Sequence, residues 1–293
     1  MTASAAGGIG ITTRGNGGDA CLAAPQVAHG KGQGVGEWVL GRMLGRGAFG
    51  VVYKARLVPS GETVAVKTIN IDGLNENELR AVENEIMMMR HLHHPNVVHY
   101  LGMEAHPKHL NIFLEYVDGG SLRKMLEKTG PLSEPHTACN TKQILEGLRH
   151  LHTRNITHRD VKGANILVCR DGSLKLADFG AAKRMGHESV CGGLKGTPHW
   201  MAPEVIRGQQ MASGWFKADV WSVGCTVVEM LTGRMPWPNI SNPMAAMYRI
   251  ANGEKPPLDR DISPEASAFV DSCCSADPMQ RKSVDQLMQS AFL

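Results

Sequence analysis

The chain has 293 residues, of which 42% are hydrophobic and 20% are charged, so it holds enough apolar material for a sizeable core. Its 31 basic and 28 acidic side chains give a net charge of +3, which is too balanced to indicate nucleic acid or an anionic membrane as the main partner. The seven cysteines include no C-x-x-C pair, which favours reduced thiols in a cytoplasmic protein over a disulfide framework or a zinc site. The run His91–His94 has no cysteine or acidic residue at ligand spacing, which disfavours a metal site there.

The first segment, residues 1–36, is rich in glycine and alanine and has no hydrophobic period, so we expect a disordered tail. No stretch approaches the ~20 apolar residues of a membrane span, and the N-terminus lacks the pattern of a secretory signal. We therefore expect one ordered domain, residues 37–293.

The first part of this domain, residues 37–117, is rich in strand patterns. Val51–Tyr53 and Thr63–Val66 are β-branched or apolar runs separated by a turn signal. The apolar spacing of three and four over residues 76–92 predicts a helix, which Pro95 ends. Two further strands are predicted at Val97–Leu101 and Asn111–Tyr116.

The remainder, residues 118–293, is mainly helical in pattern. Two short strands are the exception, and the Asp171-Gly172 turn signal joins them. The predicted helices and strands are Ser121–Lys128, 134–153, 218–232, 264–274, Ile166–Val168 and Leu174–Leu176. The contrast between the two parts predicts two unequal lobes with a cleft between them.

Residues Gly45–Val52 read G-x-G-x-x-G-x-V, a spacing that lets backbone amides approach phosphate oxygens. A dinucleotide-binding fold uses the same glycine spacing but opens a helix with it. Here the glycines lie between two predicted strands, which disfavours that fold.

Lys67 ends the apolar run Val64–Val66, and burying a lysine without a partner is costly. Nucleotide phosphates and the carboxylate of Glu85, on the following helix, are suitable partners. A surface lysine on an edge strand remains an equal alternative for this residue taken alone.

Three further motifs follow in order. His158–Asn165 reads H-R-D-x-K-x-x-N, Asp178–Gly180 reads D-F-G, and Ala202–Glu204 reads A-P-E. Chance does not supply all of them in this order and at these intervals.

With these motifs, the segment from about 38 to 293 resembles a eukaryotic protein kinase domain. The resemblance implies an α+β fold, with a small antiparallel sheet and one main helix in the N-lobe (37–117) and a larger, mainly helical C-lobe (118–293). Lys162 fits the serine/threonine pattern, Gly196–Glu204 resembles the STE group, and Glu83–Ile86 with Leu110–Ser121 resembles MAP kinase kinase kinases.

The resemblance implies ATP and Mg²⁺ as cofactors and assigns roles to the motif residues. Asp160 would orient the acceptor hydroxyl and take its proton, Lys162 would stabilise the transferred phosphoryl group, and Thr197 would hydrogen-bond near both. Asn165 and Asp178 would hold the metal.

By the same resemblance, Lys67 would hold the α- and β-phosphates and Glu85 would fix Lys67. Leu114 would guard the back of the adenine pocket, while the backbone of Glu115 and Val117 would read the adenine edge. The implied nucleotide-binding residues are Leu44, Gly45, Arg46, Gly47, Ala48, Phe49, Gly50, Val51, Val52, Ala65, Lys67, Leu114, Glu115, Val117 and Leu167.

Structural roles are implied as well. Glu204 would pair with Arg281, and Asp219 would brace the catalytic loop. The family's stacked internal spine would comprise Met89, Tyr100, His158 and Phe179.

The loop before Glu204 departs from the family pattern, because Gly193 and Lys195 stand where relatives often carry a phosphorylated side chain. Ser189 is then the regulatory site, received by Arg159, or the loop needs no phosphate. Ser121 and Ala164 stand where basophilic kinases often carry carboxylates, so we expect no strong selection of arginine in the substrate.

The expected substrates are proteins, namely MAP kinase kinases. Two other hypotheses stand beside an active serine/threonine kinase: a kinase-fold scaffold without catalysis and a small-molecule kinase. Intact Lys67, Asp160 and Asp178 speak against the scaffold, and Gly196–Trp200, the predicted peptide platform, speaks against the small-molecule enzyme.

Overall fold

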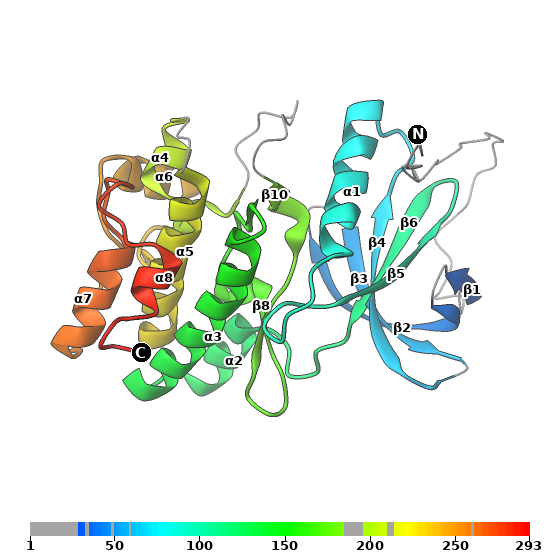
Figure 1. The fold of residues 1–293 in the computed structure, drawn as a ribbon, viewed down its shortest axis with the longest axis horizontal. Helices are drawn as coiled ribbons and strands as arrows, with labels where there is room; N and C mark the ends of the chain where they lie inside the picture. The colour runs from blue at the N-terminus through cyan, green and yellow to red at the C-terminus, as the bar shows by residue number, and fades with distance from the viewer. Residues whose placement is uncertain are drawn as a thin grey trace, which may run out of the picture. The chain divides into compact units, whose positions relative to one another are not determined.

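The computed structural model describes residues 29–32, 35–47, 50–58, 60–184, 196–209, 214–258 and 261–293. The chain divides into two units. The first comprises residues up to His91 together with His99–Tyr116, and the second comprises Leu92–Val98 together with Val117–Leu293. Figure 1 shows the first unit as a sheet with one long helix and the second as mainly helical.

The first unit is built on a six-stranded antiparallel sheet with the order β1-β2-β3-β4-β6-β5. Helix α1 (Glu76–Met89) begins at a capping box, in which Asn75 accepts from the Glu78 backbone and the Glu78 side chain accepts from the Asn75 backbone. The strands are β1 (His29–Gly32), β2 (Gly36–Gly47), β3 (Gly50–Leu57), β4 (Thr63–Asn70), β5 (Tyr100–Ala105) and β6 (His109–Glu115).

Strand β1 lies inside the segment that the composition predicts to be disordered. His29–Gly32 pairs with β2 in antiparallel register, with Lys31 opposite Glu37 and Gly30 opposite Trp38. Such a local hairpin has little loop-closure entropy to overcome and adds its backbone hydrogen bonds to an existing sheet edge. Strand β1 thus lies before the predicted start of the domain at residue 37.

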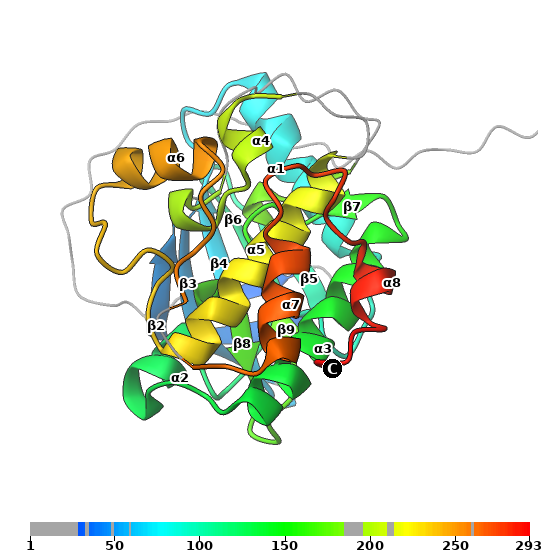
Figure 2. The same cartoon turned by 90° about the vertical axis from the view of Figure 1, so that its left-hand side faces the viewer.

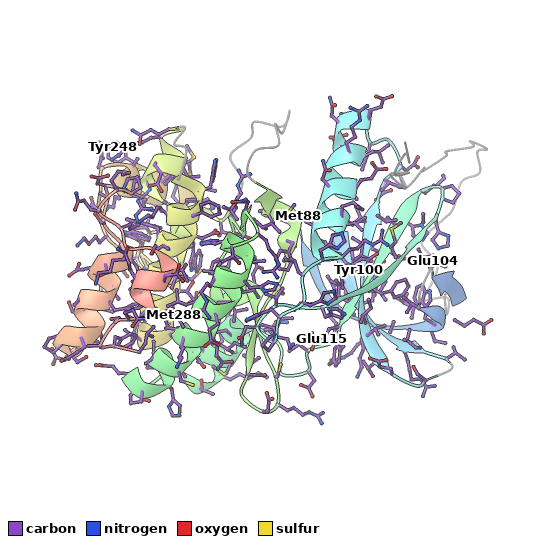
Figure 3. The ribbon with its side chains drawn as sticks, viewed as in Figure 1. Met88, Tyr100, Glu104, Glu115, Tyr248 and Met288 are labelled. Atoms are coloured by element: carbon purple, nitrogen blue, oxygen red, sulfur yellow. The ribbon has the colours of Figure 1, made fainter. Side chains whose placement is uncertain are left out.

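The core of the first unit forms around Trp38, which is 3% exposed. Its ring packs edge-on against Phe113, with 5.4 Å between the ring centres. The indole Nε1 donates to Oε2 of Glu104 over 3.1 Å, so the buried N–H is satisfied. Glu104, labelled in Figure 3, also accepts from Asn111 of β6 over 3.3 Å.

The second unit is organised around helix α5, which is buried over most of its length and therefore apolar on nearly all sides. Helices α3 and α7 pack against α5, and Figure 2 shows α7 beside it. The helices of this unit are α2 (Leu122–Thr129), α3 (Glu134–His152), α4 (Pro203–Ile206), α5 (Gly214–Thr232), α6 (Pro243–Ala251), α7 (Pro264–Cys273) and α8 (Val284–Leu287). Among the described helices, none has both the length and the apolar character needed to cross a membrane.

Two small antiparallel pairs complete the second unit: β7 (Ile156–Thr157) with β10 (Lys183–Arg184), and β8 (Ile166–Val168) with β9 (Leu174–Leu176). The β8–β9 pair confirms the predicted hairpin. Gly172 takes a φ of +83° in its turn, a conformation that glycine adopts without a steric cost.

One predicted strand is wrong in position. The expected strand Val97–Leu101 is replaced by β5, which begins at Tyr100, while Val97 and Val98 belong to the second unit. The Val98 N–H donates to the Leu176 carbonyl over 2.9 Å, and the Asn96 side chain donates to the Leu174 carbonyl over 2.9 Å. These partners lie about 80 residues away in the sequence, so the local pattern could not indicate them.

Candidate active site

A buried carboxylate on α5, Asp219, holds the backbone of the loop that carries Asp160. Asp219 accepts from the N–H of His158 over 2.9 Å and from the N–H of Arg159 over 2.7 Å. The Nε2 atom of His152 lies 2.9 Å from the same carboxylate. Burial opposes ionisation of Asp219, but these hydrogen bonds outweigh it and lower its pKa. The predicted brace is therefore confirmed.

Three polar side chains hydrogen-bond to the carboxylate of Asp160. Its Oδ2 accepts from Nζ of Lys162 and from Nδ2 of Asn165, each over 2.7 Å. Its Oδ1 accepts from the hydroxyl of Thr197 over 2.8 Å. Lys162 also donates to the oxygen of Thr197. These four residues come from two segments of the chain, and the fold brings them together as the sequence predicts.

Asn165 is held in one orientation by the same loop. It ends the 3-10 turn Gly163–Asn165, and its amide donates to the backbone carbonyl of Asp160 over 2.9 Å in addition to the side-chain contact. Both amide hydrogens are used in this way, so the carbonyl oxygen Oδ1 is the atom that Asn165 can offer to a cation.

Asp178 precedes a second 3-10 turn, Phe179–Ala181, and adopts a φ of +61°. A non-glycine residue in this left-handed region carries a strain that the surrounding fold must hold in place. Phe179 is 3% exposed and its ring lies 5.2 Å from the ring of His158. Packing of Phe179 therefore fixes where the chain places Asp178.

Arg159 has an environment that sequence reasoning did not anticipate. Its φ is +67°, and its guanidinium lies over the ring of Trp215 on α5, 4.1 Å from the ring centre. The Nε atom is buried and has no hydrogen-bond partner among the described residues. Burial lowers the pKa of Arg159, and the carboxylate of Asp219 opposes that shift.

Sequence reasoning also missed a second carboxylate that supports the loop carrying Asp160. Glu229 on α5 is fully buried, and its Oε2 accepts from the N–H of Gly163 over 3.0 Å. A Cβ at Gly163 would lie 2.8–2.9 Å from that carboxylate, so a larger residue there would have to displace the carboxylate. Oε1 of Glu229 lies 3.5 Å from Nη1 of Arg123 on α2. Burial raises the pKa of Glu229, and the Gly163 and Arg123 contacts oppose that shift. No local signal marks Glu229, because Gly163 is 66 residues away.

The predicted phosphate-binding glycines lie in the first unit, at the ends of β2 and β3. Gly50 has a φ of +141°, and a Cβ there would lie 2.2 Å from the carbonyl oxygen of Thr68, so this position requires glycine. Built Cβ atoms at Gly45 and Gly47 meet nothing within 4 Å. Ala48 and Phe49 lie outside the described residues.

Lys67 is 7% exposed on the central strand β4, opposite Val52 of β3 and Ile112 of β6. The alternative of a surface lysine on an edge strand is therefore wrong. Glu85 lies on α1, but its side chain is outside the described residues, so its pairing with Lys67 stays a prediction.

The other predicted nucleotide-binding residues are distributed over both units. Leu167 lies on β8 and Val117 is the first residue of the second unit's main segment. Glu115, at the end of β6 (Figure 3), accepts from the His99 N–H over 3.2 Å through its side chain. Those in the strands of the first unit are Leu44, Arg46, Val51, Val52, Ala65 and Leu114.

The predicted pair of Glu204 and Arg281 is present and buried. Two parallel hydrogen bonds of 2.7 Å join the guanidinium to the carboxylate. The predicted regulatory Ser189, with Gly193 and Lys195, lies outside the described residues. Among the described residues, no group of three or more His, Cys, Asp or Glu side chains is placed to hold a metal ion.

The comparisons with known proteins agree with this geometry. The family model for the protein kinase domain matches residues 38–293. Mitogen-activated protein kinase kinase kinase 3 of Arabidopsis thaliana is 43% identical over 268 residues, which cover 88% of this chain and 41% of the relative.

Two further relatives are a second mitogen-activated protein kinase kinase kinase and a protein named for cytokinesis. Mitogen-activated protein kinase kinase kinase A of Dictyostelium discoideum is 42% identical over 264 residues, covering 88% of this chain and 28% of the relative. Cytokinesis protein sepH of Emericella nidulans is 42% identical over 260 residues, covering 88% and 19%. The chain thus spans less than half the length of these relatives.

Proposed function

The chain belongs to the protein kinase domain family, and from that premise we propose that it transfers the γ-phosphoryl group of ATP to serine and threonine side chains of proteins. The observation that supports this proposal best is the set of contacts around Asp160. Lys162, Asn165 and Thr197 all hydrogen-bond to its carboxylate. An aspartate oriented in this way can accept the proton of an acceptor hydroxyl.

The residues around Asp160 would stabilise charge, orient the reacting groups and support the loop backbone. Lys162 carries a positive charge next to the carboxylate and stabilises negative charge on the phosphoryl group in transfer. Thr197 donates to Asp160 and accepts from Lys162, so one hydroxyl orients both groups. Asp219 and Glu229 hold the loop backbone through the N–H groups of residues 158, 159 and 163. The site is thereby preorganised for positioning and charge stabilisation, which dominate phosphoryl transfer.

The side chains fit a magnesium–ATP complex. Magnesium in such sites is held by one or two protein oxygens together with phosphate oxygens, rather than by a cage of protein ligands. The oriented carbonyl of Asn165 and the carboxylate of Asp178 would supply those oxygens. Bound Mg²⁺ would neutralise charge on the phosphate oxygens. Gly45, Gly47 and Gly50 would approach the phosphates, and the buried ammonium of Lys67 would add a positive charge.

We propose MAP kinase kinases as the physiological acceptors. Several relatives carry the name mitogen-activated protein kinase kinase kinase, and they share about 42% of residues with this chain over its kinase domain. Ser121 caps α2 and Ala164 lies in the 3-10 turn, so neither position offers a carboxylate to an arginine of the acceptor. A peptide array with strong arginine selection would contradict this expectation.

The decisive experiment compares the wild type with Asp160→Asn in phosphate transfer from magnesium-ATP to a generic protein acceptor. We expect Asp160→Asn to lose at least about 100-fold in kcat, because asparagine cannot accept the proton. Asp171→Asn, in the exposed β8–β9 turn, is the matched control and should keep full activity. Equal incorporation by wild type and Asp160→Asn would refute the role of Asp160.

The same assay separates the alternatives. A kinase-fold scaffold would give no transfer with any acceptor, although it would still bind partners. A small-molecule kinase would leave protein acceptors unlabelled while consuming ATP with a small hydroxylated substrate. Candidate MAP kinase kinases, tested as acceptors in parallel, then distinguish the proposed substrate from a generic one.

A further inference from the structure

The second unit contains a groove of about 480 Å³ at the C-terminal ends of helices α2 and α5. It lies outside the hydrogen-bonded set around Asp160. Its apolar wall is made by Leu126, Pro131, Leu231, Met235, Pro238 and Pro257. We refer to it below as the α2–α5 groove.

The floor of the α2–α5 groove is fixed by close backbone contact. Gly233 ends α5 with a φ of +68°, and a Cβ there would lie 2.9 Å from the backbone nitrogen of Pro131. The next residue, Leu132, donates its N–H to the carbonyl of Met230 over 2.9 Å. The groove is therefore preformed, and a ligand need not supply the free energy of ordering it.

A strained residue lies in the chain between two lining residues of the groove, Met235 and Pro238. Trp237 is 2% exposed and adopts a φ of +53°, an uncommon conformation for a bulky side chain. The fold maintains this strain where the chain turns between Met235 and Pro238, two of the lining residues.

The charges of the groove favour an acidic ligand. Its charged lining residues are Glu127 and Arg234. The carboxylate of Glu127 is held by Nε of Arg123 over 2.8 Å, so its charge is already balanced. Arg234 is exposed, and within the described part of the chain no carboxylate pairs with it. The uncompensated charge at the rim is positive, and it complements a carboxylate on the ligand.

The groove is also connected to the catalytic loop. Arg123, which holds Glu127, lies 3.5 Å from Oε1 of the buried Glu229. Glu229 in turn accepts from the N–H of Gly163, three residues after Asp160. One arginine therefore contacts both a lining residue of the groove and the carboxylate that supports the loop.

We propose that the α2–α5 groove is a docking site for the protein acceptor. Its occupant is a segment that inserts an apolar side chain between the prolines and leucines and places a neighbouring carboxylate on Arg234. This inference rests on the proposed kinase function and deepens it, because it assigns substrate selection to a surface away from the transferred phosphate. The apolar wall suits an anchor side chain of a protein partner, and the charge of Arg234 suits a carboxylate beside that anchor.

The test uses the panel of MAP kinase kinases and takes forward the best acceptor, both as intact protein and as a short peptide around its phosphorylated residue. We expect Arg234→Glu to raise the ratio of KM for the intact acceptor to KM for the peptide by about fivefold, because a rim charge contributes about that factor to association. Met235→Ser should raise the same ratio by removing part of the apolar wall. Arg56→Glu, an exposed arginine of β3, makes the same charge change and should leave the ratio unaltered.

The outcomes separate the two proposals. An unchanged ratio in both Arg234→Glu and Met235→Ser overturns the docking site while the kinase function stands. If the wild type phosphorylates neither acceptor form, the proposed function fails. In that case docking is decided by the Kd of the intact MAP kinase kinases of the panel, measured by calorimetry for the wild type, Arg234→Glu and Arg56→Glu. A Kd that Arg234→Glu raises and Arg56→Glu does not supports the groove, and equal or undetectable binding overturns it.

Discussion

The guanidinium of Arg159 lies 4.1 Å from the centre of the Trp215 ring, so the residue directly before the proposed base is held from α5 by a cation–π contact. Asp219, four residues after Trp215, binds the backbone N–H of the same arginine over 2.7 Å. Helix α5 therefore contacts both the backbone and the side chain of Arg159. This arrangement holds a residue with a φ of +67° in place.

Removal of this ring should weaken the catalytic loop. We expect Trp215→Ala to lower the free energy of unfolding by about 2–4 kcal/mol, which combines the lost cation–π contact with the lost packing of a large side chain. We also expect a lower kcat, because Arg159 directly precedes Asp160. Trp215→Phe keeps a ring and should recover most of both quantities. Urea unfolding and steady-state kinetics measure them, and identical values for Ala and Phe would contradict a role for the ring.

The hydroxyl of Thr197 should matter more than its methyl group. Thr197→Val keeps the shape but loses the hydrogen bonds to Asp160 and Lys162. We expect kcat to fall about 100-fold, since small misplacements of catalytic groups have effects of this size. Thr197→Ser retains the hydroxyl and should stay within about threefold of wild type. A Val variant as active as the Ser variant would show that the hydroxyl does not position Asp160.

Because Glu204 and Arg281 form a buried ion pair, we expect single variants to lower the free energy of unfolding more than the double variant does. Arg281→Met leaves an unpaired buried carboxylate and should lower the free energy of unfolding by about 3–5 kcal/mol. Glu204→Leu combined with Arg281→Met removes both charges and should be less destabilising than either single change. Lys255→Met breaks an exposed pair with Asp271 and should have an effect below about 1 kcal/mol. Chemical denaturation of the wild type, Arg281→Met, Glu204→Leu, the double variant and Lys255→Met checks this order.

The contact of His94 with His150 predicts a loss of stability in acid. The rings lie 4.8 Å apart, and Nε2 of His150 is buried without a partner among the described residues. Burial lowers the pKa of His150 to about 4, and Arg154 and His94 add to this effect. Burial also lowers the pKa of His94. The charged groups around the two rings are Glu146, which favours protonation of His94, and His93, Arg149, Arg154 and Lys175, which oppose protonation of one or both rings.

The sign of the effect follows from these shifts. A histidine whose folded pKa lies below its unfolded value of 6.5 binds its proton more readily when the chain is unfolded. The contribution of His150 to the free energy of unfolding is therefore complete above about pH 6.5 and is lost as the pH falls toward about 4. His150→Phe keeps a ring but cannot titrate, so its free energy of unfolding should fall less than that of wild type between pH 7 and pH 5. Equal losses in both proteins would mean that His150 does not contribute.

Much of the fold could be predicted from local patterns. The helix at α1 has its apolar spacing and its Asn75 cap in neighbouring residues, and the β8–β9 hairpin has its turn in Asp171-Gly172. Helix α6 was not predicted, although the sequence offers Asn242 as a cap with Pro243 at the first helical position. Strand β1 was missed because it has almost no apolar side chains, and its stability comes from pairing with β2.

The sequence by itself determined the family and the residues that take part in the proposed chemistry, because Asp160, Lys162, Asn165 and Asp178 lie in short motifs with fixed spacing. Only the tertiary structure decided what holds Asp160 in position. Trp215, Asp219 and Glu229 reach the catalytic loop from α5, more than 50 residues along the chain. Contacts at such a separation arise from packing around a buried helix and leave no periodicity or motif in the loop itself. The order of residues thus specified the reacting groups, and the three-dimensional packing of α5 specified their support.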